Sequence, residues 1–219
     1  MGTLSSLGGD LLKYYLDGGP VMHAISVLSL ASLTTIVYKL IVFRQVKLNL
    51  NEFISKVRGA LLKNNVKGAM GVCEENRGPV ASIVKTGLLK FGKPRDEIEK
   101  TMENAAIHEV AYLEQYLAVL ATIANIAPLL GFLGTVVGMI LSFDVIAQHG
   151  LNNPGLVAKG ISVALLTTAY GLVVAFVTQP FYNFFNSKVV AYTRQIETAS
   201  NILFETLDEM DSGDKAATA

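Results

Sequence analysis

Two threonines lie in the middle of long apolar segments, where a hydroxyl oxygen can bind a cation or a water molecule. Thr135 lies in the run 127–143 and Thr168 in the run 156–186. Hydrocarbon offers no polar ligand, so an oxygen at such a position lowers the cost of moving a charge through a membrane. A membrane threonine also commonly bonds the carbonyl one turn earlier on its own helix, and this structural alternative stays open. Two such hydroxyls favour a polar path over plain membrane anchors.

Small residues accompany both hydroxyls at helical spacing. The first segment carries Gly131, Gly134, Gly138 and Ser142, and the second carries Gly160, Ala164, Gly171 and Ala175. Stripes of small residues let helix backbones approach closely inside a membrane. The two segments are therefore predicted to pack tightly, and the glycine stripes predict self-association of the chain.

The composition predicts an all-α membrane protein. Of 219 residues, 51% are hydrophobic and 16% are charged, and 18 basic residues balance 18 acidic ones, which argues against a nucleic-acid partner. Three stretches, 21–43, 118–147 and 156–186, reach the roughly 20 residues that span a bilayer. Neither a basic region before the first stretch nor a cleavage site after it is evident, so it is read as a retained transmembrane helix.

The distribution of basic residues predicts the topology. Most of them lie between Arg44 and Lys100, whereas the connection 148–155 has none. Because basic loops stay on the cytoplasmic side, we expect the cytoplasmic parts to be a helical domain at 44–117 and a C-terminal helix and tail at 187–219. The N-terminal segment 1–20 and the turn 148–155 are then expected on the outer side.

The cytoplasmic part is predicted to be helical, with helix ends at Asn64-Asn65, Arg77-Gly78-Pro79 and Gly92-Lys93-Pro94. The apolar pattern that begins at Ile98 continues into the second span without a stop, which predicts one long helix. Residues 187–210 continue the third span in the same way, and these extensions are expected to pack together in a helical bundle. The polar tail 211–219 is expected to be disordered.

The short turn makes the second and third spans an antiparallel hairpin. Counting back from the turn places Thr135 level with Thr168, and Asp144 level with Lys159 on the opposite helix faces. Asp144 and Lys159 are interpreted as a structural ion pair, with a proton-carrying Asp144 as the alternative. Pro128 and Pro180 are expected to bend their helices and free backbone carbonyls, or to be packing kinks only.

An enzyme is not indicated. Ser162 is a nucleophile in type, but no histidine is expected at its depth, because His23 opens the first span, His108 is cytoplasmic and His149 lies in the outer turn. No metal-binding pair and no phosphate-binding loop occurs in the sequence, so no catalytic or metal residue is assigned. The single Cys73 excludes an internal disulfide and is interpreted as a small buried apolar residue.

Two stretches of sequence resemble a known family. The segment APLLGFLGTVVGMILSF and the later segment GISVALLTTAYGLVVAFVTQPFYNFF are similar to the MotA/TolQ/ExbB proton-channel family, and within it to the ExbB and TolQ branch. The resemblance implies a homopentamer around a central pore that holds two copies of a single-span partner of the ExbD or TolR type. It also implies that the partner carries the titrating membrane aspartate.

The resemblance assigns roles to individual residues. Thr135 in LGTVVG and Thr168 in ALLTTAYG match the pore-lining threonines, and Pro128 matches the proline that opens the second core helix. Many ExbB and TolQ chains have a glutamate where this chain has Val163. Thr167 adds a hydroxyl near that position, which makes Na⁺ coupling an alternative to the favoured H⁺, unless Thr167 only bonds its own helix. No cofactor is implied beyond the transported ion.

The resemblance thus implies an ion-conducting motor subunit in the bacterial inner membrane, driven by the proton motive force, that energises TonB-dependent transport through a TonB-like protein. A TolQ-like or gliding-type stator is the alternative within the family. A membrane scaffold that does not conduct ions is the alternative from another class.

Overall fold

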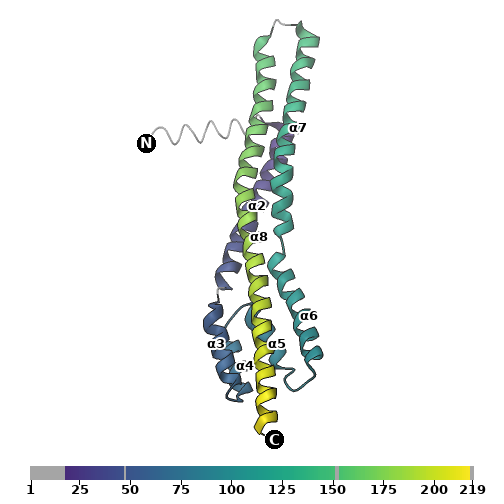
Figure 1. Ribbon diagram of the computed structural model, residues 1–219. Helices are drawn as coiled ribbons and strands as arrows, with labels where there is room; N and C mark the ends of the chain where they lie inside the picture. The colour runs from purple at the N-terminus through teal and green to yellow at the C-terminus, as the bar shows by residue number, and fades with distance from the viewer. Residues whose placement is uncertain (1–17, 47, 151–152, 218–219) are drawn as a thin grey trace, which may run out of the picture. The chain divides into compact units, whose positions relative to one another are not determined.

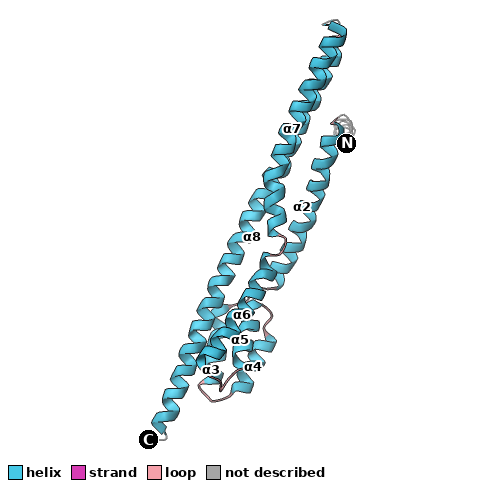
Figure 2. Cartoon of the chain, turned by 90° about the vertical axis from the view of Figure 1, so that its right-hand side faces the viewer, coloured by secondary structure: helices cyan, strands magenta, loops and turns pink. Residues whose placement is uncertain are grey.

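The computed structural model describes residues 18–46, 48–150 and 153–217, and the regular structure in this part of the chain is entirely helical (Figures 1 and 2). The helices are α2 (Gly19–Gln45), α3 (Leu50–Leu61), α4 (Val66–Glu75), α5 (Pro79–Leu88), α6 (Arg95–Glu114), α7 (Leu117–His149) and α8 (Pro154–Ala217). Residues 1–17 of the predicted N-terminal segment, residues 151–152 of the predicted turn and residues 218–219 of the tail lie outside the described residues.

The three apolar stretches fall inside α2, α7 and α8. Three helical stretches are long and apolar enough to cross a membrane, Gly19–Leu61, Arg95–His149 and Pro154–Met210. The all-helical fold class with three candidate spans agrees with the prediction from sequence.

The chain divides into two compact units. The first, here called the hairpin unit, comprises residues up to Val37 together with Tyr116–Phe184, and the second, the short-helix unit, comprises Tyr38–Gln115 together with Phe185–Ala219. In the hairpin unit, α7 and α8 run side by side in both views (Figures 1 and 2). Ile25 of α2 packs there against Ile123 and Ala127 of α7 and Val174 of α8, so the first part of α2 is held by apolar contacts.

The short helices end where turn-forming residues occur. Asn64 has a φ of 55°, and the side chain of Asn65 then accepts a 2.8 Å hydrogen bond from the Gly68 N–H and caps α4. Gly78 has a φ of 146° just before Pro79, the first residue of α5. Gly92 has a φ of 84° in the connection to α6. Such φ values favour glycine because it has no Cβ, so the predicted helix ends are confirmed.

A single apolar core holds the short-helix unit together. Buried residues from α3, α4, α5, α6 and α8 form it, among them Phe53, Cys73, Ile83, Met102 and Leu203. The part of α8 beyond residue 187 contributes to this core together with α6.

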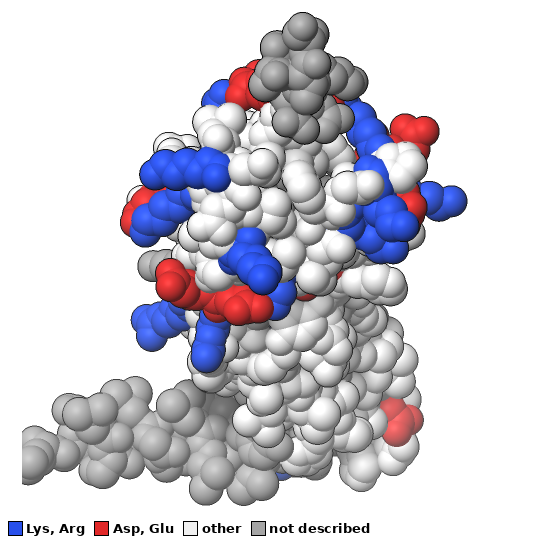
Figure 3. Space-filling model, turned by 90° about the horizontal axis from the view of Figure 1, so that it is seen from below, with Lys and Arg blue, Asp and Glu red and all other residues white. Residues whose placement is uncertain are grey.

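Ion pairs on the surface of this unit join the same helices. Arg58 of α3 pairs with Glu209 of α8 at 2.8 Å, and Arg95 of α6 pairs with Asp208 of α8. Figure 3 shows Lys and Arg interspersed with Asp and Glu over the short-helix unit. These side chains are largely exposed, so each pair contributes about 0–1 kcal/mol at most and the apolar core provides the main stabilisation.

The prediction of one long helix through the second span is wrong. Helix α6 ends at Glu114 and α7 begins at Leu117. Between them Gln115 is non-helical (φ −47°, ψ 134°) and Tyr116 is left-handed (φ 64°, ψ −3°). Residues 115 and 116 form a turn. Neither glycine nor proline marks this break, although Tyr116 adopts a conformation that non-glycine residues rarely adopt.

Helix α8 continues from Pro154 to Ala217 and contains Pro180 in its interior. The expected disorder of the tail is therefore wrong up to residue 217. The residues directly after Met210, Asp-Ser-Gly-Asp, are poor helix formers. They follow a helix that is already formed, however, so they need no new nucleus.

Candidate functional site

The glycines of α7 lie directly against α8. A Cβ at Gly131 would lie 3.0 Å from the Thr167 carbonyl oxygen, and one at Gly134 would lie 2.2 Å from the Thr167 Oγ1. A Cβ at Gly138 would lie 2.8 Å from the carbonyl oxygen of Gly160. A side chain at any of these positions would force the neighbouring helix to shift. We call these glycines, together with their counterparts on α8, the hairpin seam.

The glycines of α8 complete the seam. A Cβ at Gly160 would lie 2.2 Å from the Ser142 Oγ, and one at Gly171 would lie 2.5 Å from the Ala127 carbonyl oxygen. Ser142 is buried and donates to the Gly138 carbonyl at 2.9 Å and to the Val157 carbonyl of α8 at 3.3 Å. Both glycine stripes are thus used for close contact within one chain, so they are not evidence for association between copies.

Thr168 bonds across this seam. It is partly buried, and its Oγ1 donates to the Gly131 carbonyl of α7 at 2.8 Å. Because a hydroxyl has one proton and two acceptor lone pairs, this bond uses the proton and leaves lone-pair capacity on the oxygen. An oxygen in that state can accept a hydrogen bond from water or contact a cation.

Thr135 has the same hydrogen-bonding state. Its Oγ1 donates to the Phe132 carbonyl of its own helix at 2.6 Å, and its side chain is partly exposed. Thr168 lies beside Gly131, which precedes Thr135 by one helical turn, so the two hydroxyls lie within about one turn of each other in depth. The bond from Thr135 is the own-helix bond that the structural alternative describes, and it is compatible with a second ligand on the same oxygen.

Thr167 differs from the other two threonines. It is only 1% exposed, and its Oγ1 donates to the carbonyls of Val163 at 3.1 Å and Ala164 at 2.9 Å. A residue that lines a pore between copies has to be exposed on its own chain. The burial of Thr167 in the seam therefore favours the alternative in which it bonds its own helix over a role as an ion ligand.

The charged pair near the turn remains a prediction. Asp144 is exposed, and its Oδ2 accepts a 2.9 Å hydrogen bond from Gln148 one turn later on α7. Lys159 is exposed on α8. Among the described residues no group of three or more His, Cys, Asp and Glu side chains is placed to hold a metal ion.

The two prolines lie inside continuous helices, Pro128 in α7 and Pro180 in α8. Proline has no N–H, so the carbonyls four residues earlier, on Ala124 and Phe176, receive no helical hydrogen bond from these positions. Such carbonyls are polar groups at membrane depth.

Lys39 is a buried charge that the sequence analysis did not single out. Its side chain is 0% exposed, and its Nζ donates to the Leu113 carbonyl at 2.8 Å. The ammonium group also lies 5.7 Å from the ring centroid of Phe43, one turn later on α2. The sequence signal that could have identified Lys39 is its position as a lone charge inside an otherwise apolar run.

Comparison with known proteins places these helices in a family. Residues 75–198, more than half of the chain, match the family described as MotA/TolQ/ExbB proton channel family. An ExbB homolog of Methanothermobacter thermautotrophicus is 29% identical over 83% of this chain and 64% of its own length. The ExbB-like protein 3 of Synechocystis is 32% identical over 81% of this chain and 84% of its own length.

Two further comparisons cover different shares of the chain. ExbB of Salmonella typhimurium is 40% identical over 42% of this chain and 38% of its own length. Several curated relatives are thus longer than the part that this chain spans. The solved structure of C. jejuni MotAB has a TM-score of 0.64 at 18% identity, covers 94% of this chain and 86% of its own, and shares the fold. The chain is a membrane protein that belongs to the MotA/TolQ/ExbB proton channel family.

Proposed function

We propose that this chain is the ion-conducting subunit of an ExbB–ExbD-type complex in the bacterial inner membrane. Family membership supports a channel role, and the names of the ExbB relatives favour biopolymer transport. Within this proposal, a TonB-like protein receives the work of the complex. The observation that carries the proposal is the state of two hydroxyls. Thr135 and Thr168 each donate a hydrogen bond to a backbone carbonyl, and both side chains are partly exposed on the hairpin.

The titrating acid has to come from another subunit. Residues 117–143 and 154–196 contain neither aspartate nor glutamate. Val163 stands at the position where the family resemblance implies a glutamate in many ExbB and TolQ chains. We infer a pentamer with two copies of a single-span partner, whose membrane carboxylate meets the oxygens of Thr135 and Thr168. These oxygens would replace part of the hydration shell of the ion and so lower the free-energy cost of placing the ion in the channel.

The favoured orientation has the N-terminus outside and the C-terminus in the cytoplasm, as the basic residues of the short-helix unit indicate. Protons are favoured as the transported ion. The sodium alternative depended on Thr167, whose hydroxyl is buried and bonded twice within its own helix. A Thr167→Ala variant should therefore keep the ion dependence of the wild type when its motor output is measured with and without sodium.

The test of the proposal removes single hydroxyls without changing side-chain shape. Thr135→Val and Thr168→Val should each reduce proton flux at least about tenfold in proteoliposomes that contain the chain and its single-span partner, as expected where a polar ligand is lost in a low-dielectric path. Thr122→Val is the matched control, because Thr122 is an exposed threonine of α7 with a similar own-helix bond to Ala118.

Two further measurements separate conduction from packing. Thr168→Ser keeps the hydroxyl and should restore flux, and the size of the assembled complex should be unchanged in all variants. Normal flux in both valine variants, with assembly intact, would leave the non-conducting scaffold as the better description.

A further inference from the structure

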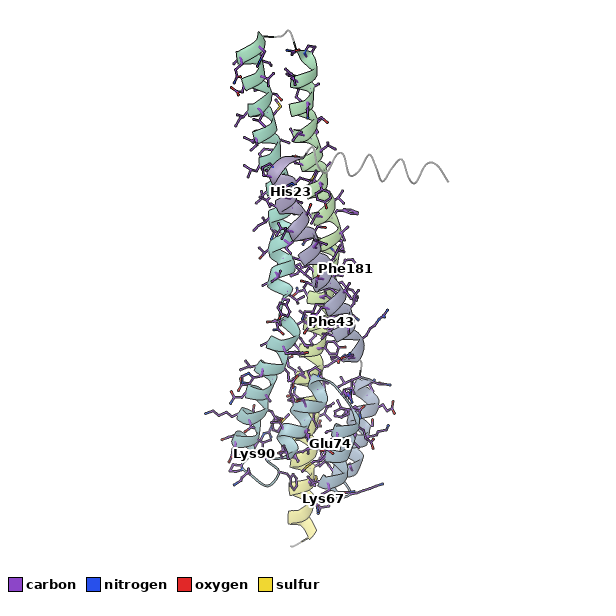
Figure 4. The ribbon with its side chains drawn as sticks, turned by 180° about the vertical axis from the view of Figure 1, so that it is seen from behind. His23, Phe43, Lys67, Glu74, Lys90 and Phe181 are labelled. Carbon is purple, nitrogen blue, oxygen red and sulfur yellow. The ribbon has the colours of Figure 1, made fainter. Side chains whose placement is uncertain are left out.

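Three groups hold the end of α2 in the short-helix unit. Lys39 donates to the Leu113 carbonyl at the end of α6. Phe43, labelled in Figure 4, stacks on Phe185 of α8 with ring centroids 5.6 Å apart. Tyr192 of α8 stacks on Phe43 at 6.0 Å. This part of α2 is thus fixed to α6 by a charge and to α8 by aromatic rings.

The Leu113 carbonyl has two possible donors. In a continuous helix it would accept the N–H of Leu117, four residues later. In the structure the last helical bond of α6 runs from the Gln115 N–H to the Ala111 carbonyl at 3.0 Å, and the non-helical Gln115 and Tyr116 interrupt the ladder. The Leu113 carbonyl accepts the Lys39 ammonium instead.

The sequence between the two helices favours the continuous form. Glu114, Gln115, Tyr116 and Leu117 are all compatible with helix, and the apolar pattern crosses them without a change of phase. Left-handed Tyr116 is an unfavourable conformation for a residue with a Cβ. A compensating interaction must favour the broken form.

The Lys39 ammonium provides that interaction. Carbonyls at a helix C-terminus carry partial negative charge, so a cation that donates to them is favourable. The bond is charge-assisted and buried, where it is stronger than in water. In the broken form the Leu113 carbonyl loses the Leu117 N–H, and Lys39 supplies the missing donor. In the continuous form this carbonyl, which has two lone pairs, would keep a donor with or without Lys39, so Lys39 favours the broken form.

We propose that Lys39 is a positioning residue that selects the broken over the continuous form of the α6–α7 segment. The segment Leu113–Leu117 is then a two-state element, and Lys39 sets its equilibrium by holding the Leu113 carbonyl. This proposal rests on the contacts of Lys39 and Leu113 and is independent of ion conduction.

The experiment reads the backbone conformation of Tyr116. The dipeptide Gln115–Tyr116 occurs once in the sequence. Isotope labelling of tyrosine and of the carbonyl carbon of glutamine therefore selects the signal of Tyr116. The signal is recorded by solid-state NMR of the chain in lipid bilayers. The Cα and Cβ shifts then distinguish left-handed from helical backbone. Lys39→Met keeps an unbranched side chain, one atom shorter, without the charge. In this variant the ratio of helical to left-handed signal should rise at least about tenfold, as loss of a charged hydrogen bond implies.

Two variants control for charge and for position. Lys39→Arg keeps a donor cation and should keep Tyr116 left-handed. Arg44→Met removes an exposed cation from the last turn of the same helix and should leave Tyr116 unchanged. An unchanged Tyr116 signal in Lys39→Met would overturn the proposal, and so would general loss of helical signal in α6, since Lys39 would then only cap that helix.

A second variant covers the case in which Lys39→Met does not accumulate. In Tyr116→Ala the local preference moves toward helix, while Lys39 is intact. The proposal expects the backbone at position 116 of this variant to keep a left-handed population, which the same NMR measurement detects when alanine is labelled in place of tyrosine. Complete conversion of this position to helix would show that the side chain of residue 116, and not Lys39, selects the break.

Discussion

Gly134 faces the side chain of Thr167 with no room for a methyl group. Its Cβ would meet the Thr167 Oγ1 at 2.2 Å and the Thr167 Cβ at 2.6 Å. Gly134→Ala should therefore lower the free energy of unfolding by about 1–3 kcal/mol, the usual cost of overpacking. Denaturant unfolding in detergent measures the change.

Gly71 in α4 is the matched control, since a Cβ there would meet nothing within 4 Å. Gly71→Ala should raise the free energy of unfolding by about 0.5–1 kcal/mol, because alanine is the better helix former. Equal effects of the two substitutions would contradict close packing at the seam.

Cys73 is buried in the core of the short-helix unit, and burial raises the pKa of its thiol to about 11. Only the thiolate reacts with alkylating agents. Below this pKa the thiolate fraction rises about tenfold per pH unit, so alkylation should be slow at pH 7 and accelerate up to about pH 11. Mass spectrometry follows the reaction, with the unfolded chain in detergent as the reference. Fast alkylation of the native protein at pH 7 would contradict this burial.

At the scale of elements, the last turns of α8 divide into a part that packs and a part beyond the core. Leu203 and Phe204 are buried, and Leu207 and Met210 pack against the same core. A chain that ends after Met210 should keep the thermal unfolding of the wild type. A chain that ends after Ala199 lacks all four of these apolar side chains and should be destabilised by several kcal/mol. Circular dichroism during heating compares them, and similar melting of both chains would show that this end of α8 contributes nothing.

The sequence predicted elements better than their interruptions. Long apolar runs indicated α2, α7 and α8, and Gly78, Gly92 and Asn64 marked helix ends because their backbone conformations need such residues. The break at Tyr116 was missed because neither glycine nor proline marks it, and because the bond from Lys39 to the neighbouring Leu113 carbonyl joins residues far apart in the sequence. The helix at 211–217 was missed because the polar composition of this segment was taken to indicate disorder, whereas it continues α8.

The candidate site could be predicted only in part. The types and spacing of Gly131, Gly134 and Thr168 indicated close helix packing, and the seam shows it. A stripe of small residues does not reveal whether it packs within one chain or between copies. Nor does it reveal which of two adjacent threonines is buried, since the helix phase that buries Thr167 depends on where α7 lies.

At the scale of the whole molecule, the chain lacks a carboxylate of its own at the depth of the two threonines. Residues 117–143 and 154–196 contain no acid. Under the proposed function, proteoliposomes with this chain alone should show no proton flux above empty vesicles, and addition of the single-span partner should start it. Replacing the partner's membrane aspartate with asparagine should abolish it. A fluorescent pH dye inside the vesicles measures each case, and flux through the chain alone would refute dependence on a partner.

The hydrogen bonds of Thr135 and Thr168 limit how a proton could travel past them. A Grotthuss relay needs each member to accept one proton and release another. Both hydroxyls donate to backbone carbonyls, those of Phe132 and Gly131, so each would have to break that hydrogen bond before it could pass its hydrogen onward. Under the proposed function these threonines are stationary supports, and the hopping must take place through water molecules that they help to align.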